Sequence, residues 1–456
     1  MPRADAKALA RRKRREEITT HFFPAPLARN RYRVHSLIGE GAYGVVCSAI
    51  DTTTNHRVAV KRILKCLGTH PMATRVLREL KFLRMLSAHQ NIIQVKDVLL
   101  PSDIDRFNDT FVVFELMPTD LNRLLKTDTT LTHAHIKYFM FQLLCGINFM
   151  HDARVFHRDL KPNNVLINGR CQLRICDFGL ARAAFEDGPD TLFWTDYVAT
   201  RWYRAPELIM AYYTKYSTAI DLWSVGCIFA EMLGGGKVLF EGKNSRHQIE
   251  LITDVIGPPP ASAIQKLRDP QARRVLSEFQ NMTQPQRPLD TLFPDADPLA
   301  IDVLRGMLAF DPDERISAVE ALRYPYFSEY LHLGLGAKAE PLPASEFNFE
   351  RSKLSPDQMR EEFLREILHY HPEASVEVLR RWSTGHAYQV RSAVDQFGRE
   401  VSRLVQNNPG MPIASQTLQE RVMEEITQEN RMVETYAERR QHVTMTESEM
   451  SQFMQR

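Results

Sequence analysis

The sequence HRDLKPNN at residues 157–164 is followed, after a short apolar run, by ICDFGLAR at residues 175–182. The first motif carries the carboxylate of Asp159, which can accept a proton from a hydroxyl group. Asp177 and Asn164 offer carboxylate and amide oxygens, the ligands that Mg²⁺ prefers when phosphates and water complete its shell. Together the two motifs predict a site that handles phosphate and magnesium.

A glycine-rich loop lies upstream, where residues 38–46 read IGEGAYGVV. Glycine adopts backbone angles closed to other residues and brings its amides close to phosphate oxygens. The spacing alone is weak, because dinucleotide-binding folds use the same string and an ordinary glycine hairpin would also fit. A dinucleotide fold needs a helix next, whereas VVCSAI at residues 45–50 is typical of a strand.

The run VAVK at residues 58–61 lies on the next predicted strand. Strand alternation puts Ala59 and Lys61 on one face, so Ala59 can contact an adenine while Lys61 reaches its phosphates. Glu79 lies on a helix predicted over residues 73–86 and is the natural partner of Lys61. Taken alone, Lys61 could equally be a solvated charge on a strand.

These motifs in this order are the established signature of ATP-dependent protein kinases, and the residue roles follow from that signature. Asp159 is then the catalytic base, and Lys161 steadies the transferring phosphoryl group. The Mg²⁺ ligands are Asn164 and Asp177, and the catalytic set also includes Lys61 and Glu79. Structural roles are predicted for Asp221, which would hold the catalytic-loop backbone, and for Glu207, which would pair with Arg315.

The predicted fold class is α+β, a bilobal protein kinase fold with an ATP cleft between its lobes. Short β-branched runs indicate a small β-rich lobe over residues 31–116. A larger helical lobe is expected over 117–330, with long apolar helices at 135–150 and 220–233. The flanking segments are expected to be a flexible basic segment over 1–30, a C-terminal extension packing on the kinase domain over 331–406 with a helix at 356–368, and a polar tail over 407–456 that is either helical or disordered.

Between Asp177 and Glu207 the chain reads DFGLARAAFEDGPDTLFWTDYVATRWYRAPE. The run Thr195-Asp-Tyr197 before VATRWYRAPE closely resembles mitogen-activated protein kinases. More narrowly, FWTDYVATRWYRAPEL is similar to the TDY-type subgroup of plant and green-lineage enzymes, and the likeness spans about residues 32–372. The resemblance implies transfer of the ATP γ-phosphate, with Mg²⁺, to Ser-Pro or Thr-Pro sites in proteins, and activation by phosphorylation of Thr195 and Tyr197.

The resemblance also implies which residues contact phosphate and nucleotide. The expected ATP-binding residues are Ile38, Gly39, Glu40, Gly41, Ala42, Tyr43, Gly44, Val46, Ala59, Lys61, Phe114, Glu115, Met117 and Asp120. Arginine binds phosphate oxygens in pairs, and the expected receivers are Arg75, Arg78, Arg158 and Arg182 for phosphothreonine and Arg201 and Arg204 for phosphotyrosine. Arg75 could instead pair with Glu79 along its helix. A pocket for the substrate proline is expected from Val198, Arg201 and Arg204.

Composition narrows the expected partners. The net charge of +2 creates no global field that would recruit nucleic acid or an acidic membrane. The six cysteines show no CxxC pair, and no apolar run approaches the roughly 18 residues that cross a bilayer. We expect a cytoplasmic protein, with the nucleus left open because RRKRR at residues 11–15 is either an import signal or a solvated segment. The partners that the resemblance implies are protein substrates, an upstream dual-specificity mitogen-activated protein kinase kinase and phosphatases.

Two other readings stay open. A pseudokinase scaffold would keep the fold without turnover, although Lys61, Asp159, Asn164 and Asp177 are all intact. A cyclin-dependent kinase would have a partner-binding helix of different sequence near residues 70–80 and would lack the Thr-Asp-Tyr run. The acidic docking patch usual in mitogen-activated protein kinases is missing from residues 328–341, which leaves the docking mode undetermined.

Overall fold

The computed structural model describes residues 13–24, 31–41, 44–127, 131–184, 200–210, 218–266, 270–279, 287–334, 338–352, 354–371 and 374. The chain divides into two compact units, one of residues 1–347 with 363–370 and the other of residues 348–362 with 371–456. Within the described ranges, no helix is both long and apolar enough to span a bilayer.

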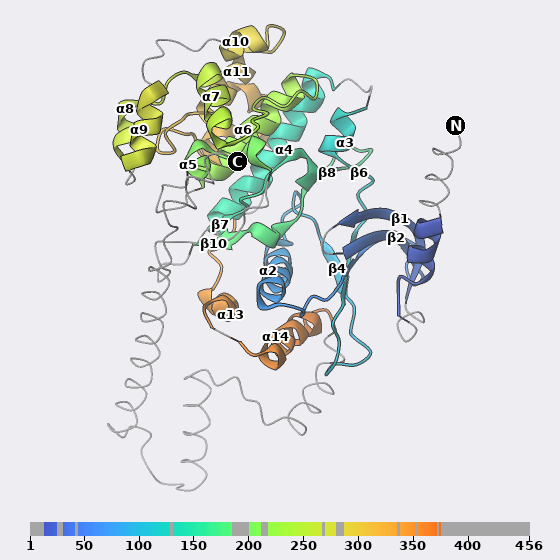
Figure 1. The fold of residues 1–456 in the computed structure, drawn as a ribbon. Coiled ribbons are helices and arrows are strands. Elements are labelled where there is room, and N and C mark those ends of the chain that lie inside the picture. The colour runs from blue at the N-terminus through green and yellow to red at the C-terminus, as the bar shows by residue number, and fades with distance from the viewer. Residues whose placement is uncertain are drawn as a thin grey trace, which may run out of the picture. The chain divides into compact units, whose positions relative to one another are not determined.

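A five-stranded antiparallel sheet forms the first lobe of the larger unit, in the order β1-β2-β3-β5-β4 (Figure 1). Its strands are β1 (Tyr32–Gly41), β2 (Gly44–Asp51), β3 (Arg57–Ile63), β4 (Val95–Val98) and β5 (Thr110–Glu115). The β-rich lobe predicted from the sequence is confirmed. Strand β4 was not predicted, because its short sequence VKDV shows no clear alternation of apolar and polar residues.

Helix α2 (His70–Leu86) follows β3 and begins three residues earlier than the pattern predicted. The side chain of Thr69 accepts a hydrogen bond from the backbone N–H of Met72, and Pro71 occupies the first turn, where a missing N–H costs nothing. Apolar residues of α2 are buried, among them Val76, Leu80 and Leu83. This packing fixes the helix that carries Glu79.

The second lobe is mainly helical, as predicted. Its first elements are β6 (Thr119–Asp120), α3 (Leu121–Leu125), α4 (His133–Asp152), β7 (Val155–Phe156), η2 (Pro162–Asn164), β8 (Val165–Ile167), β9 (Leu173–Ile175), η3 (Phe178–Leu180) and β10 (Arg182–Ala183). The later elements are η4 (Arg201–Tyr203), α5 (Pro206–Ile209), α6 (Ala219–Leu233), α7 (Ser245–Ile256), α8 (Ala261–Lys266), α9 (Pro270–Phe279), α10 (Leu289–Leu292), α11 (Pro298–Met307), α12 (Ala318–Leu322) and η5 (Pro325–Leu333).

Gly146 lets α4 pack closely against the segments that carry the site. A Cβ atom at this position would lie 2.8 Å from Ile175 Cδ1 and 3.2 Å from Asn91 Cβ, distances that real Cβ atoms rarely show. Ile175 ends β9, two residues before Asp177. The glycine therefore helps to set the position of the Asp177 loop against the central helix.

Residues 13–24 differ from the flexible segment that the sequence predicted. Residues 13–20 form a helix, and Phe22 beyond it is 1% exposed. Phe22 belongs to the apolar cluster on the sheet with Tyr32, Val60 and Phe111, and Phe23 packs beside it. Pro24 lies four residues beyond the end of this helix, so it leaves the helix intact.

The C-terminal elements are η6 (Ala344–Phe347), α13 (Asn348–Arg351) and α14 (Pro356–Leu368), the last with the predicted bounds. Residues 344–347 and 363–370 belong to the larger unit, where Glu346 and Glu366 form ion pairs with α2. The predicted polar tail at 407–456 lies outside the described residues.

Candidate active site

Lys61 and Glu79 meet across β3 and α2. Lys61 Nζ donates to Glu79 Oε1 at 2.7 Å, and both side chains are largely buried. Burial alone would lower the pKa of Lys61, but the carboxylates of Glu79 and Asp177 outweigh it and raise that pKa above its ordinary value. The lysine therefore stays positively charged where the sequence predicts ATP phosphates.

Asp177 occupies an unusual backbone position beside Lys61. Its φ is +65°, in the left-handed region that residues other than glycine rarely adopt. Burial alone would raise the pKa of Asp177, but electrostatic interactions with Lys61, His157 and Arg75 hold it below its ordinary value. Asp177 is thus an ionised carboxylate at neutral pH.

The catalytic loop brings Asp159, Lys161 and Asn164 together. Lys161 Nζ donates to Asp159 Oδ2 at 2.6 Å. The amide nitrogen of Asn164 donates to the backbone oxygen of Asp159 at 2.8 Å and to its Oδ2 at 3.2 Å. Three of the predicted catalytic and metal-binding residues therefore share one hydrogen-bonded cluster.

Buried Asp221 supports this loop, as the sequence predicted. Its carboxylate accepts hydrogen bonds from the backbone N–H groups of His157 and Arg158, each at 2.9 Å. Burial alone would raise the pKa of Asp221, but His151 and these hydrogen bonds lower it below its ordinary value. The charge of Asp221 therefore holds the backbone of the loop, including Arg158 at φ +69°.

The donor set fits Mg²⁺. Because the side-chain N–H of Asn164 donates to Asp159, the Oδ1 atom of Asn164 remains as an acceptor for a cation. The backbone N–H of Cys176 donates to the backbone oxygen of Asn164 at 3.0 Å, which places the Asp177 loop beside Asn164. Among the described residues, no group of three or more His, Cys, Asp and Glu could hold a metal by itself. One carboxylate and one amide oxygen suit an ion whose shell is completed by phosphates and water.

The predicted adenine-binding residues lie where β3, β5 and the following segment meet. Ala59 pairs with Phe114 in the ladder between β3 and β5. Glu115 is already engaged through its carboxylate, which accepts a hydrogen bond from Arg174 Nε at 2.9 Å. Asp120 caps α3 by accepting from the backbone N–H of Arg123 at 2.9 Å. Met117, between Glu115 and Asp120, is buried.

The glycine loop closes the turn between β1 and β2. Ile38, Gly39, Glu40 and Gly41 end β1, and Gly41 pairs with Gly44 at the start of β2. A Cβ atom on Gly44 would lie 2.0 Å from the backbone oxygen of Arg62, so this position accepts only glycine without a backbone shift. Val46 pairs with Lys61 on β3. Ala42 and Tyr43 lie outside the described residues.

Four of the six predicted phosphate-receiving arginines surround the start of the activation segment. Arg78 donates to the backbone oxygen of Gly179, and the guanidinium of Arg75 lies beside the same glycine. Arg182 on β10 pairs with Phe156 on β7. Phe156 precedes Arg158 by two residues, so this pairing brings Arg182 close to Arg158 in the chain path. Glu79 pairs with Lys61, whereas Arg75 on the same helix lies near Asp177 and Gly179. Arg75 is therefore directed toward the activation segment. Thr195 and Tyr197 lie outside the described residues.

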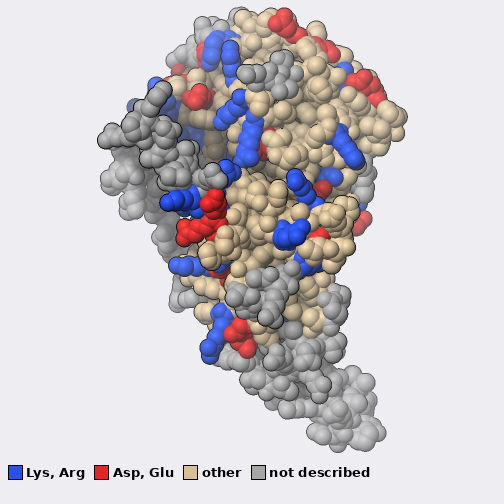
Figure 2. Space-filling model, turned by 90° about the vertical axis from the view of Figure 1, so that its right-hand side faces the viewer, with Lys and Arg blue, Asp and Glu red and all other residues tan. Residues whose placement is uncertain are grey.

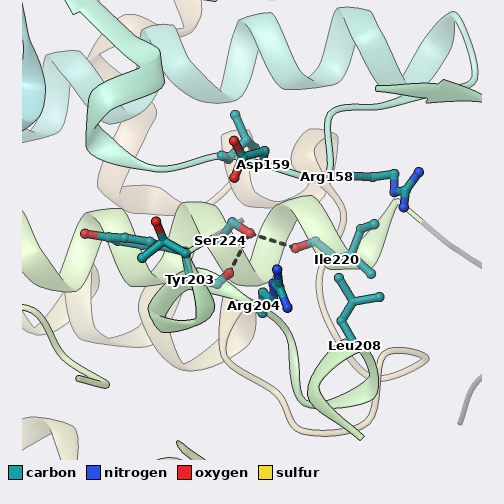
Figure 3. Close-up of a pocket in the computed structure, with 9 residues that line it drawn as sticks. Arg158, Asp159, Tyr203, Arg204, Leu208, Ile220 and Ser224 are labelled. Carbon is teal, nitrogen blue, oxygen red and sulfur yellow. Dashed lines mark hydrogen bonds between the residues drawn. The ribbon is translucent and has the colours of Figure 1, made fainter. Parts of the chain in front are cut away.

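Arg201 and Arg204 diverge. Arg201 Nη1 donates to the backbone oxygen of Lys243, whereas Arg204 lines a small cavity beside Asp159 (Figure 3). Its lining residues are Arg158, Asp159, Leu160, Thr200, Tyr203, Arg204, Leu208, Ile220 and Ser224. Of the predicted proline-pocket residues only Arg204 lines this cavity, and Val198 lies outside the described residues.

The other walls of this cavity come from separate elements, so the sequence did not predict them. Ser224 on α6 donates to the backbone oxygens of Tyr203 at 2.8 Å and of Ile220 at 3.2 Å, as Figure 3 shows. The hydroxyl of Tyr203 also donates to Glu231 Oε2 at 2.6 Å, and burial raises the pKa of Glu231. The one sequence signal for these contacts is that the run RWYRAPE at residues 201–207 is followed along the chain by a strongly apolar helix.

The chain is similar to known protein kinases over most of its length. Residues 32–327 match the family model described as the protein kinase domain. Mitogen-activated protein kinase 9 of Arabidopsis thaliana is 47% identical over 390 residues, which cover 86% of this chain and 76% of that protein. Mitogen-activated protein kinase 8 of the same plant is 48% identical over 396 residues, covering 87% and 66%. Mitogen-activated protein kinase 14 of Oryza sativa subsp. japonica is 49% identical over 376 residues, covering 82% and 68%.

Proposed function

Because this chain belongs to the mitogen-activated protein kinases, we propose that it phosphorylates serine or threonine residues followed by proline after Thr195 and Tyr197 are themselves phosphorylated. It is a Ser/Thr protein kinase of signal transduction, and its relatives are plant enzymes, in agreement with the resemblance in the activation segment. These relatives all carry the same family name, which disfavours a cyclin-dependent kinase.

One observation above all supports an active enzyme. The ion pair between Lys61 and Glu79 is formed, and Asp177 keeps its charge beside Lys61. In protein kinases this pair and the metal-binding aspartate must both be in place for phosphoryl transfer. A scaffold that only preserved the fold would have no need for all three side chains in this arrangement.

The proposed reaction is direct transfer of a phosphoryl group. The substrate hydroxyl oxygen forms a bond to the γ-phosphorus, the bond from that phosphorus to the β–γ bridging oxygen breaks, and ADP leaves. Asp159 orients the hydroxyl and accepts its proton, while Lys161 Nζ donates a hydrogen bond to the Asp159 carboxylate at 2.6 Å. Mg²⁺, held by Asp177 and Asn164, would neutralise charge on the phosphates.

The arginines provide an electrostatic basis for the proposed activation. A phosphate on Thr195 adds a charge of roughly −1.5 to −2 and three acceptor oxygens. Arg75, Arg78, Arg158 and Arg182 lie around the base of the segment that carries this threonine, and bidentate arginine contacts would order it. Arg204 is the better placed of the two arginines proposed for Tyr197, because it lines the cavity beside Asp159.

The remaining proposals concern partners and location. An upstream dual-specificity kinase would add the two phosphates and phosphatases would remove them, and we propose the cytoplasm as the site of action, with the nucleus open. Fractionation of cells that express the tagged chain tests the location. Recovery mainly with membranes would contradict it.

Phosphate transfer from MgATP to matched Ser-Pro and Ser-Ala peptides, before and after modification of Thr195 and Tyr197, tests the proposed function. We expect transfer to rise strongly after modification, to favour the Ser-Pro peptide and to be lost in Asp177→Asn. Equal transfer to both peptides would contradict the proline requirement. No transfer in either state, with nucleotide still bound, would instead favour a scaffold.

A further inference from the structure

The basic cluster at residues 11–15 runs into a helix that packs on the sheet lobe. Figure 1 shows this dark blue helix beside β1 and β2. Its end is anchored by Phe22, which is 1% exposed and contacts Phe111 at 5.9 Å between ring centroids. Ile18 packs against the same apolar cluster. Apolar burial therefore holds the helix in place independently of its charges.

A second anchor joins the segment to β3. Arg62 Nη1 donates to the backbone oxygens of His21 at 3.2 Å and of Phe22 at 2.9 Å. The other end of this guanidinium binds Asp109 Oδ2 at 2.8 Å, which holds Arg62 in position. Arg62 is the neighbour of Lys61, so the segment is tied to the strand that carries the nucleotide-binding lysine.

The basic side chains at the start of the helix reach the strand that leads into the glycine loop. Arg14 forms an ion pair with Glu40, and Arg15 Nη2 donates to the backbone oxygen of Leu37 at 3.3 Å. Leu37 and Glu40 flank Ile38 and Gly39 at the end of β1. The helix therefore bridges from β3 to the glycine loop.

We propose that Arg14, assisted by Arg15, is a positioning residue for nucleotide binding, and this rests on the glycine loop binding nucleotide as in the proposed function. Two physical effects act together. A contact that holds a glycine-rich loop lowers the entropy lost when the loop orders around a ligand. In addition, Arg14 neutralises Glu40, whose carboxylate would otherwise repel the nucleotide phosphates.

The expected effect is modest because the ion pair is partly exposed. The side chains of Arg14 and Glu40 are 67% and 40% exposed, so solvent screens their attraction. We expect Arg14→Ala to weaken nucleotide affinity by about two- to five-fold at low ionic strength. The effect should shrink at about 0.5 M salt, where the Debye length is only a few ångströms.

Calorimetric titration of the full-length chain with a non-hydrolysable MgATP analogue tests this proposal. Lys13→Ala is the matched control, because it removes the same charge from the same cluster without an observed contact to β1 among the described residues. We expect Lys13→Ala to bind like the unmodified chain and Arg14→Ala to bind more weakly, with equal thermal midpoints. In the kinase assay, Arg14→Ala should raise KM for ATP and leave kcat unchanged.

A chain that carries Glu40→Gln tests whether the Arg14–Glu40 contact causes the effect. If the contact is the cause, Arg14→Ala should lose most of its effect in a chain that already carries Glu40→Gln. Equal weakening by Arg14→Ala and Lys13→Ala, or an undiminished Arg14→Ala effect in the Glu40→Gln background, would overturn the proposal. Failure of the unmodified chain to bind nucleotide at all would instead overturn the proposed function.

Discussion

Neighbouring charges, more than burial, control the ionisation of Lys61 and Asp177. Burial opposes the charged form of both groups, yet the pKa of Lys61 is raised and that of Asp177 is lowered by opposite charges nearby. Both side chains therefore stay charged at neutral pH. The sequence predicted the two roles, but not that His157 and Arg75 also act on Asp177.

Asp159→Asn should lower kcat by about 10²- to 10⁴-fold, because the variant retains the hydrogen-bonding shape but cannot accept the hydroxyl proton. Steady-state kinetics on the activated chain measure this. Nucleotide affinity and thermal midpoint serve as controls and should be unchanged, since Asn can still accept from Lys161 and Asn164. A rate within a few-fold of normal would show that Asp159 is not the base.

His89 should make the fold less stable in acid. Burial and then the charge of Arg174 lower the pKa of His89 to about 4, from 6.5, while the ring packs on Phe149. Between these values the unfolded chain binds the proton more tightly, so the contribution of neutral His89 is present above about pH 6.5 and is lost as pH falls toward 4. A shift of this size corresponds to about 3 kcal/mol.

Denaturant unfolding of the unmodified chain and of His89→Asn between pH 7 and pH 5 measures this effect. Asparagine keeps an acceptor for the backbone N–H of Asn91, which His89 Nδ1 now binds at 3.1 Å. The variant should be less stable at pH 7 but should lose less stability on acidification. Parallel pH profiles for the two chains would contradict the prediction.

At the level of elements, α2 joins the active site to the C-terminal chain. It presents Glu79 to Lys61, while Lys81 and Arg84 bind carboxylates from beyond the kinase domain match. Arg84 Nε donates to Glu366 at 2.6 Å, and Glu346 accepts from Arg84 at 2.9 Å and from Lys81 at 3.0 Å. These contacts from the C-terminal chain help to keep Glu79 in register with Lys61.

Glu366→Ala should lower the free energy of unfolding by about 3 kcal/mol, because it removes a buried carboxylate that pairs with Arg84 and Lys81. Glu366 is fully buried. The matched control is Glu278→Ala, since Glu278 pairs with Arg246 on the surface, where such a loss costs about 1 kcal/mol or less. Denaturant unfolding of both variants compares them. Equal losses would show that the buried network adds nothing beyond a surface pair.

For the whole molecule, the active site is assembled from segments that are distant in the chain. Lys61 and Glu79 come from the sheet lobe, whereas Asp159 and Asp177 come from the helical lobe. On the face shown in Figure 2, Lys and Arg side chains occur beside Asp and Glu side chains, in keeping with a net charge of only +2. The positive charges that matter for phosphate are therefore local to the site.

Nucleotide should stabilise the whole chain. A ligand that binds only the folded state at 100 times its dissociation constant adds about 2.7 kcal/mol. We expect MgATP analogue to raise the thermal midpoint, with a smaller rise after chelation of Mg²⁺ and in Asp177→Asn, since both remove the ion from the phosphates. A rise that is identical with and without Mg²⁺ would contradict the assignment of Asp177 and Asn164.

Much of the fold was predictable because its signals are local. The strands around VAVK and the helix at 356–368 show clear residue patterns, and the structure confirms them. Strand β4 was missed because its short sequence shows no clear alternation, and it is held by pairing with β5. The helix at 13–20 was missed because the residues that follow it pack on the sheet. The walls of the cavity beside Asp159 were also missed, since α5 and α6 contribute them from separate parts of the chain.

The sequence by itself determined the chemistry of this protein, because the catalytic and metal-binding residues occur in short motifs whose order along the chain is diagnostic. Tertiary structure alone decided that Arg75 lies near Asp177 and that Arg14 reaches Glu40, and it formed the pair of Lys61 and Glu79 that the sequence predicted. These contacts join segments far apart in sequence. They depend on how apolar faces pack together when the chain folds, and no local pattern of residues encodes that packing.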